Sequence, residues 1–225
     1  LEQMQMSGTY CEIRDGASAT VIFSGIYRSV SVHHVNGLIT VKAEIVSATQ
    51  MLDHEKKSRS FQDVEATYGQ IVNEVLSDHP GAVALLCKEA DTPIGKPLIQ
   101  YRETDWMFIK RLAGMLGISL VSDYRAFVPR FSFGTSDSNT TAVETSQYGM
   151  QISEKYYRNG GKQGGCYKGD YQSFCFQERK NIPLGNKVSF GGGTFMVHEQ
   201  KGELRNGELI YTYQIGRQGF FAQPV

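Results

Sequence analysis

The stretch Leu98-Ile-Gln-Tyr-Arg-Glu-Thr-Asp-Trp-Met-Phe-Ile-Lys-Arg-Leu-Ala-Gly-Met-Leu-Gly117 predicts a short strand followed by an amphipathic helix. Thr104 is a typical helix N-cap, because its hydroxyl can accept a hydrogen bond from a free backbone N–H of the first turn. Asp105 follows at a place where a negative charge complements the positive end of the helix dipole. Apolar residues then recur at helical spacing before Gly117, a natural helix end: Trp106, Ile109, Leu112, Ala113 and Leu116. We expect this helix to pack onto a sheet.

A second helix is predicted upstream, over Val64–Leu76, which the turn residues Asp78–Gly81 would end. Its apolar face consists of Val64, Tyr68, Ile71, Val72, Val75 and Leu76. Apolar strands are expected over Ala82–Cys87, with Cys87 buried, and over Ile118–Ser122. The charged segment 51–59 shows no regular apolar pattern. Residues 49–125 are therefore expected to form a small α+β block with two helices.

β-Rich segments flank this block. Predicted strands at 20–25, 30–35 and 38–46 include a hairpin at Asn36-Gly37, a dipeptide that favours type I′ turns. Ile39, Val41, Ala43 and Ile45 alternate with polar residues, so we expect one buried and one solvated face.

The C-terminal third predicts strands without a helix longer than one turn. The predicted strands are Phe127–Gly134 (with Pro129 of the edge type), Tyr148–Tyr157, Tyr171–Gln177, Lys187–Phe190, Thr194–Glu199 and Leu209–Ile215. A second Asn-Gly turn precedes the last of them, in which Leu209, Tyr211, Tyr213 and Ile215 share one face. No internal repeat of fixed period is evident.

These patterns predict a β-rich α+β fold in which antiparallel β-barrel segments flank the α+β block, the C-terminal one being a barrel or sandwich. The expected domains are 1–48 (strands of a first barrel), 49–125 (the α+β block) and 126–225 (the barrel or sandwich segment).

Charge and hydropathy exclude two classes of partner. Lys and Arg together number 23, as do Asp and Glu, so the formal net charge is zero. This removes the usual electrostatic argument for nucleic acid. No apolar run approaches the ~20 residues of a membrane-spanning helix. We expect neither a nucleic-acid partner nor a membrane-spanning segment.

The candidate chemical sites each have a structural explanation. Glu103 and Asp105 are two neighbouring acids, but the helix start explains Asp105, and an ion pair with Arg102 or Lys110 explains Glu103. The glycine-rich run 159–166 lacks the phosphate-loop spacing and is expected to be a hairpin tip. Cys166 and Cys175 flank that hairpin; they could pair in an oxidising setting, and we expect free thiols.

The remaining candidates are equally weak. His33 and His34 would point to opposite faces of a strand, so they cannot chelate one ion together as neighbours. Asn139 heads a chance match to the glycosylation pattern. We therefore predict no catalytic, cofactor-binding or metal-binding residues, and no enzymatic activity.

The string Gln100–Ala113, closing on Gly117-Ile118, resembles the VgrG-type spike proteins and the phage late-control D or baseplate hub proteins. Two upstream strings are similar to the same family: Phe23-Ser-Gly-Ile-Tyr27 and Ser58-Arg-Ser-Phe-Gln-Asp63. More loosely, residues 180–216 resemble the closing barrel of hub proteins. Only about twenty residues precede the Phe23 strand, fewer than the family usually has, and no needle follows Val225. We therefore expect a hub module or fragment.

The resemblance implies a structural hub of a phage tail baseplate or a phage-like contractile injection system. Hub proteins of this kind carry two related β-barrels per subunit and form homotrimers that join a sixfold tail tube to a central spike. The implied partners are two further copies of the chain, the tube and the spike. The implied location is the virion tail or the injection particle, after assembly in the bacterial cytoplasm.

An alternative of another class is a tail-associated cell-wall-binding module or hydrolase. It would hold sugar on exposed aromatic residues, the candidates being Tyr156, Tyr157, Tyr167 and Tyr171.

Overall fold

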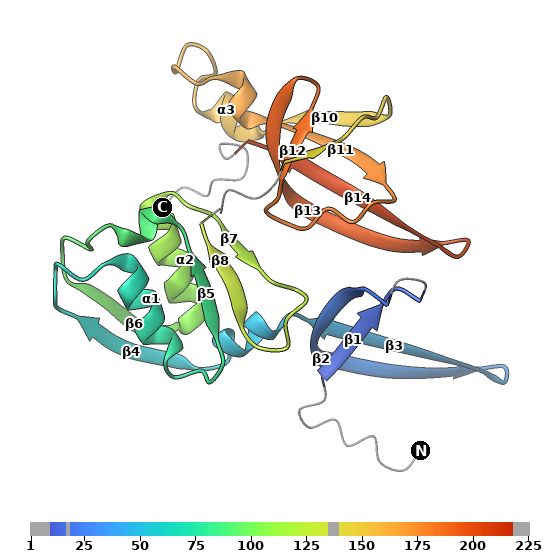
Figure 1. Cartoon of the computed structure of the whole chain (residues 1–225), viewed down its shortest axis with the longest axis horizontal. Coiled ribbons are helices and arrows are strands. Elements are labelled where there is room, and N and C mark those ends of the chain that lie inside the picture. The colour runs from blue at the N-terminus through green and yellow to red at the C-terminus, as the bar shows by residue number, and fades with distance from the viewer. Residues whose placement is uncertain (1–9, 17–18, 135–139, 218–225) are drawn as a thin grey trace. The chain divides into compact units, whose positions relative to one another are not determined.

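The computed structural model describes residues 10–16, 19–134 and 140–217. The chain divides into two compact units, Leu1–Gly134 and Thr135–Val225, and each is described by itself (Figure 1).

The first unit contains the α+β block. Its helices are α1 (Tyr68–Leu76) and α2 (Asp105–Leu116), with short 3₁₀ segments η1 (Ala48–Asp53) and η2 (Lys88–Asp91). Its strands are β4 (Lys56–Phe61), β5 (Val83–Leu86), β6 (Leu98–Thr104), β7 (Leu120–Ser122) and β8 (Arg130–Phe133). β4 pairs antiparallel with β6, while β8 lies between β5, to which it is parallel, and β7. Both helices bury their apolar faces in one core between these strands.

Helix α2 begins and ends where the sequence predicts. The Thr104 hydroxyl accepts a hydrogen bond from the backbone N–H of Met107 (3.2 Å), and Gly117 has a φ of +66°. Phe108, which the predicted face omits, is fully buried with Ile109 and Leu112.

Helix α1 begins four residues later than predicted. The Thr67 hydroxyl accepts from the N–H of Gln70, and the Gln70 side chain accepts from the N–H of Thr67. This capping box fixes the start of the helix, and it leaves Val64 outside it and exposed.

Three predictions for residues that lie in the first unit are wrong. The segment 51–59, expected to be irregular, contains the end of η1 and most of β4. The sequence shows no apolar alternation in this strand because its inward-facing positions are occupied by Lys57 and Arg59 rather than by apolar residues. The edge-strand position predicted for Pro129 is also wrong, because β8 is a central strand. Pro129 lies just before β8, and its carbonyl accepts from the N–H of Val83 (2.9 Å). Cys87 follows the end of β5 and is only half-buried.

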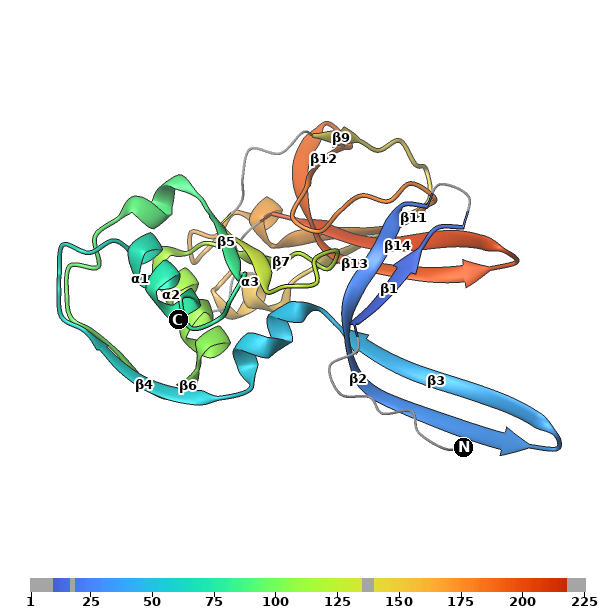
Figure 2. The same cartoon turned by 60° about the horizontal axis from the view of Figure 1, so that its bottom comes forward.

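The first unit also contains a three-stranded sheet of β1 (Tyr10–Arg14), β2 (Val21–Val35) and β3 (Leu38–Val46). β2 is one long strand where two were predicted. Asn36 (φ +51°) and Gly37 (φ +80°) confirm the predicted turn. At the base of β2, the N–H of Ser24 donates to the carbonyl of Tyr124 (2.7 Å), which ties the sheet to the α+β block. Figure 2 shows β2 and β3 extending side by side to their turn.

The predicted burial of one β3 face is wrong. Ile39 is 65% exposed and Val41 58% exposed. The alternation of apolar and polar residues is present, but within the described part of the first unit no second layer covers the apolar side.

The second unit is one six-stranded sheet in the order β10-β11-β14-β13-β12-β9. Its strands are β9 (Thr141–Ala142), β10 (Tyr148–Ile152), β11 (Gln172–Glu178), β12 (Lys187–Phe190), β13 (Gly193–Arg205) and β14 (Glu208–Gly216). All pairs are antiparallel except β9 with β12. Asn206 and Gly207 form the second predicted turn, and Tyr211, Tyr213 and Ile215, which were predicted to share one face, are buried.

The sheet of the second unit is strongly curled. The ring of Tyr148 on β10 meets the ring of Phe190 on β12 edge-on at 5.1 Å, although three strands separate them in the sheet. Among the described residues, the edge strands β9 and β10 do not pair with each other, so the expected barrel is an open, curled sheet here.

One predicted strand of this unit is partly helical. Tyr148–Tyr157 is β10 followed by α3 (Glu154–Arg158), which Ser153 caps by accepting from the N–H of Lys155 (3.3 Å). A 3₁₀ segment, η3 (Lys168–Tyr171), precedes β11. The glycine-rich run 159–166 therefore lies in the connection between the paired strands β10 and β11.

Replacing Leu112 with alanine is expected to lower the free energy of unfolding by about 2–5 kcal/mol, because a fully buried side chain leaves a cavity. Met107 lies on the exposed side of the same helix, and Met107→Ala is the matched control, with an expected change below about 0.5 kcal/mol. Urea unfolding followed by Trp106 fluorescence measures both, since this ring packs on Phe131 in the same core. Equal losses in the two variants would contradict this core assignment.

Candidate functional site

The polar residues of the strings at 58–63 and 100–113 meet around one buried carboxylate. Asp105, at the start of α2, is 1% exposed. We call its surroundings the Asp105 cluster, which consists of Lys57, Arg59, Asp78, His79, Gln100 and Asp105. These residues come from β4, from the turn after α1, from β6 and from α2.

Both oxygens of Asp105 are occupied. Oδ1 accepts from Arg59 Nη1 (2.5 Å) and from Gln100 Nε2 (2.8 Å). Oδ2 lies 2.7 Å from His79 Nε2 and 3.3 Å from Lys57 Nζ. The carboxylate is therefore held by four side chains, at least two of which are permanently cationic.

Asp78 forms the outer part of the cluster. Its Oδ2 accepts from Lys57 Nζ (2.8 Å) and from Arg59 Nη2 (2.5 Å), and its side chain is 48% exposed. Lys57 and Arg59 thus each bridge a buried and a half-exposed acid. Each of these two cations therefore has one carboxylate partner in the interior and another near the surface.

The electrostatics of the cluster favour an ionised Asp105. Burial alone would raise the pKa of this carboxyl, but hydrogen bonds from Arg59, Gln100 and His79 outweigh burial and hold the pKa well below its usual range. Hydrogen bonds from Lys57 and Arg59 likewise lower the pKa of Asp78. A carboxylate held in this way is a poor proton donor or acceptor near neutral pH. Its arrangement suits a structural role.

The other acid of the string, Glu103, pairs with Arg111. The predicted partners, Arg102 and Lys110, are wrong. Arg111 Nη2 contacts Glu103 Oε1 and also donates to the carbonyl of Ile99 (2.6 Å), while its guanidinium lies 5.0 Å from the centre of the Phe108 ring. One turn of α2 is thereby fastened to β6.

Arg102 has a different role. It sits at the irregularity in the β4–β6 pairing with a φ of +49°, and its N–H donates to the Ser58 hydroxyl (3.2 Å). Glu103 and Asp105 belong to separate ion-pair groups, with Arg111 and with Arg59 respectively.

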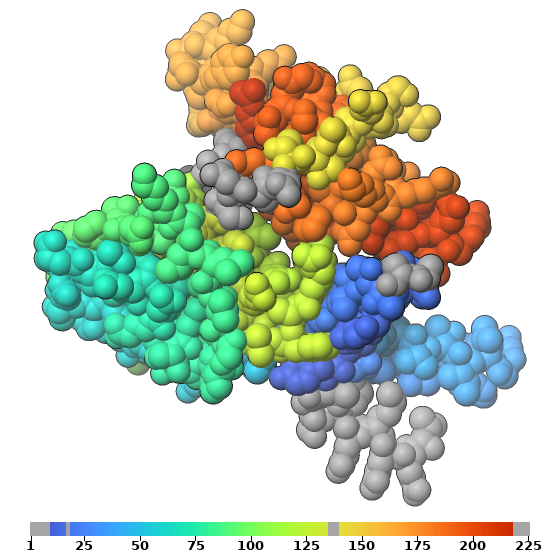
Figure 3. Space-filling view, in the orientation of Figure 1, coloured from blue at the N-terminus to red at the C-terminus, as the bar shows by residue number. Residues whose placement is uncertain are grey.

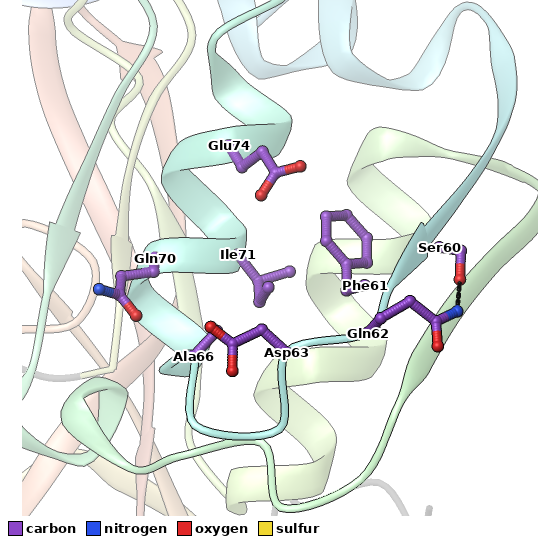
Figure 4. Close-up of a pocket in the computed structure, with 8 residues that line it drawn as sticks. All are labelled: Ser60, Phe61, Gln62, Asp63, Ala66, Gln70, Ile71 and Glu74. Atoms are coloured by element: carbon purple, nitrogen blue, oxygen red, sulfur yellow. Dashed lines mark hydrogen bonds between the residues drawn. The ribbon is translucent and has the colours of Figure 1, made fainter.

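A hollow of about 390 Å³ lies beside α1. Figure 4 shows its lining, in which Ile71 and Glu74 of α1 lie across from Phe61 at the end of β4. Several polar side chains around it have local partners: Asp63 accepts from the N–H of Glu65 (3.0 Å), Gln70 belongs to the capping box, and Gln62 donates to the Ser60 hydroxyl. The hollow has no set of converging groups that indicates a ligand.

The other candidate residues are placed as follows. Tyr156 is buried and contacts the rings of Tyr157 and Tyr171, while Tyr157 and Tyr167 are exposed. The four tyrosines do not present one shared exposed surface. Cys166 and Cys175 are free thiols, with Cys166 Sγ 3.7 Å from the carbonyl of Asn159.

His33 and His34 are both exposed on β2. Among the residues that the structure describes, no group of three or more His, Cys, Asp or Glu is placed to hold a metal ion. In the same residues, no helix is long and apolar enough to cross a membrane. Asn139 lies outside the described residues.

One exposed apolar surface stands out in the first unit. We call it the hairpin face, and it consists of Tyr27, Val30, Val32, Ile39, Val41, Ala43 and Ile45. The β2–β3 register places these residues on one side of the sheet together with His34, which lies opposite Ile39. In Figure 3 the outer part of this hairpin, in light blue, projects beyond the rest of its own unit. Contiguous exposed apolar side chains of this kind mark contact surfaces.

Sequence reasoning missed Lys57, Arg59 and His79 as partners of Asp105. The signal for Arg59 and Asp105 was present, since each lies in a string that resembles one family. Predicting the Arg59–Asp105 pair also requires the β4–β6 register. The sequence does not indicate this register because β4 is charged rather than apolar.

A model of the phage tail baseplate hub (GPD) family matches residues 1–126 of the chain. Comparison with curated proteins gives no match. Solved structures share the fold at low sequence identity.

One similar structure is the Escherichia coli c3393 protein, described as a component of the type VI secretion system that is structurally similar to the T4 bacteriophage tail proteins gp27 and gp5. The identity is 13% and the TM-score 0.68, over 92% of this chain and 63% of that one. This chain thus spans less than two thirds of the c3393 protein.

Two further structures are tail proteins. The 43 kDa tail protein of prophage MuSo2 from Shewanella oneidensis is 11% identical, with a TM-score of 0.70 over 90% of this chain and 80% of that one. The tail protein from Neisseria meningitidis MC58 is 13% identical, with a TM-score of 0.70 over 96% and 86%. At these identities the likeness shows the fold alone.

Asp105→Asn is expected to lower the free energy of unfolding by about 3–5 kcal/mol, because it leaves Arg59 and Lys57 without their buried counter-charge. Asp78→Asn is the matched control: it removes a half-exposed acid from the same two cations and should cost at most about 1 kcal/mol. Urea midpoints read by Trp106 fluorescence compare the two. A larger loss for Asp78→Asn would contradict the central place of Asp105.

The loss caused by Asp105→Asn is expected to depend on pH. The folded-state pKa of Asp105 lies below the ~3.9 of an unfolded aspartate, so its contribution to stability is present above about pH 4 and is lost as the pH falls. The difference in urea midpoint between the unmodified chain and Asp105→Asn should therefore be smaller at pH 3 than at pH 6. A constant difference would show that the charge of Asp105 is not what stabilises the fold.

Proposed function

The chain belongs to the phage tail baseplate hub (GPD) family, and from this premise we propose that it is a structural hub of a phage tail baseplate or a phage-like contractile injection system. The family match over residues 1–126 is the observation that carries the proposal. It covers the β1–β3 sheet, both helices and the Asp105 cluster. The fold shared with the tail proteins supports it.

In this role the chain assembles as a homotrimer that joins the tail tube to the central spike. Each subunit supplies two β-rich units, so a trimer presents six, and a heterologous ring of this kind closes by rotation. The β1–β3 sheet of the first unit and the curled six-stranded sheet of the second would serve as the barrel segments of such a ring. Assembly takes place in the bacterial cytoplasm, and the product is the virion tail or the injection particle.

The proposed role is that of a scaffold without enzymatic activity. Support comes from the acids of the most distinctive string, since Asp105 and Glu103 are both engaged in ion pairs that fasten α2 to β4 and β6. Such residues hold elements together, and a hub needs rigidity where it transmits force between tube and spike.

The test is assembly with the neighbouring subunits. We would co-express the chain, in its full native reading frame, with the tube and spike proteins encoded beside it. Light scattering and negative-stain images of the purified complex are expected to show three copies of the chain per particle. A chain that stays monomeric and separates from both partners would overturn the hub proposal.

A peptidoglycan turbidity assay addresses the alternative of a cell-wall hydrolase. We expect no clearing by the purified chain. Clearing that persists in Asp105→Asn and Glu103→Gln variants would assign a hydrolytic activity elsewhere in the chain and would contradict the scaffold role.

A further inference from the structure

A second hollow, of about 350 Å³, lies within the second unit. We call it the aromatic hollow, and it is lined by Tyr148, Phe174, Phe190 and Phe195 together with Val143, Glu144, Thr145 and Gly191. Half of these residues carry aromatic rings, and none of them is basic. The volume is within the range of about 300–1,000 Å³ that ligand pockets have.

The aromatic rings of this hollow meet at steep angles. The ring of Tyr148 meets those of Phe174 (5.8 Å, 70°) and Phe190 (5.1 Å, 82°). Phe174 in turn meets Phe195 at 5.2 Å and 74°. Rings arranged in this way turn their faces in different directions, as the walls of a cage do. The face of an aromatic ring is electron-rich and attracts a cation placed within about 6 Å of its centre.

The curl of the six-stranded sheet brings these rings together. Tyr148 begins β10 and Phe174 lies on β11. Phe190 ends β12, and Phe195 lies on β13. The ring of Phe190 is buried and lies nearly parallel to that of Phe176 in the core (5.8 Å, 17°), whereas Tyr148 is 54% exposed. The hollow therefore has a fixed inner side and an accessible outer wall.

Glu144 supplies the charge of this lining. Its side chain is exposed, and among the described residues of the second unit none pairs with its carboxylate. The neighbours on both sides hold its backbone in place. The N–H of Val143 donates to the carbonyl of Ser189 (3.0 Å), and the Thr145 hydroxyl accepts from the N–H of Gln147 (3.2 Å). Aromatic rings and an unmatched negative charge thus face the same hollow.

This combination fits an arginine side chain better than other groups. A guanidinium is planar, stacks on aromatic faces and gives two parallel hydrogen bonds to one carboxylate. It is also more weakly hydrated than the ammonium of lysine, so it loses less on entering an apolar hollow. A quaternary ammonium has no N–H group to donate to Glu144, and a neutral sugar would leave the carboxylate without a counter-charge.

We propose that the aromatic hollow is a contact site for an arginine side chain of a partner polypeptide. The guanidinium lies against the ring of Tyr148 and donates to the Glu144 carboxylate. Phe174 and Phe195 contact the aliphatic stem of the arginine, which is apolar. This inference goes beyond the hub role and does not depend on it.

The test is a titration of the full ¹⁵N-labelled chain with acetyl-arginine amide, followed by NMR on the backbone N–H signals of residues 143–148 and 191. Acetyl-citrulline amide is the matched ligand, because it has nearly the same shape and no charge. The dissociation constant for the arginine probe is expected to be at least about tenfold lower than for the citrulline probe. It should rise with salt concentration, since Glu144 is exposed.

Two variants locate the binding. Tyr148→Ala and Glu144→Gln are each expected to weaken binding of the arginine probe at least about fivefold. Tyr167→Ala and Glu199→Gln are the matched controls, at exposed residues of the same unit outside the hollow, and each should change the affinity less than about twofold. The dispersion of the same spectra shows whether each variant is folded.

Several outcomes would overturn the proposal. The absence of shifts near the hollow, or equal affinity for the arginine and citrulline probes, would show that the hollow does not recognise the cation. Binding that persists in both Tyr148→Ala and Glu144→Gln would place the site elsewhere. Tetramethylammonium bound as tightly as the arginine probe would assign the hollow to a quaternary ammonium group. Tube and spike proteins enter none of these readouts, so this test and the hub test fail independently.

Discussion

The ion pair between Arg59 and Asp105 is the constraint on which the first unit depends. It joins β4 to the first turn of α2, and through His79 it also fixes the turn that ends α1. A buried carboxylate is costly unless it is fully hydrogen-bonded, so the surrounding strands and helices must keep their relative positions. The residues that make the sequence strings distinctive are thus those that hold the α+β block in register.

The two Asn-Gly hairpins show that one local design can have two different surroundings. In the second unit, β11 and the aromatic residues around Phe176 and Phe190 cover the hairpin, and burial lowers the pKa of His198 to about 4. In the first unit, Arg28 lies at the surface and pairs with Glu44 (3.1 Å); like His198, it lies at a shift in the strand pairing eight residues before the Asn of its turn. The two hairpins share the same turn and strand register, whereas the neighbouring strands determine which side chains are buried.

Features governed by neighbouring residues could be predicted from the sequence. The Thr104 cap, the Gly117 end of α2 and both Asn-Gly turns depend on a few adjacent side chains, and all four are confirmed. Features governed by distant partners could not. β4 carries cations on its inner side because Arg59 pairs there with Asp105. This partner is 46 residues away along the chain, so the local sequence does not indicate it. β3 has the apolar–polar alternation of a strand with one buried face, although its apolar side is exposed. Alternation alone does not show whether a second layer covers that side.

The place of β8 has a consequence for where the first unit can be cut. The family match ends at residue 126, whereas β8 begins at Arg130 and lies between β5 and β7. A chain ended at residue 126 would leave β5 and β7 without the strand that joins them, and would remove Phe131 from its contact with Trp106. The segment matched by the family model therefore lacks the central strand of the β5-β8-β7 sheet, whereas the compact unit extends to Gly134.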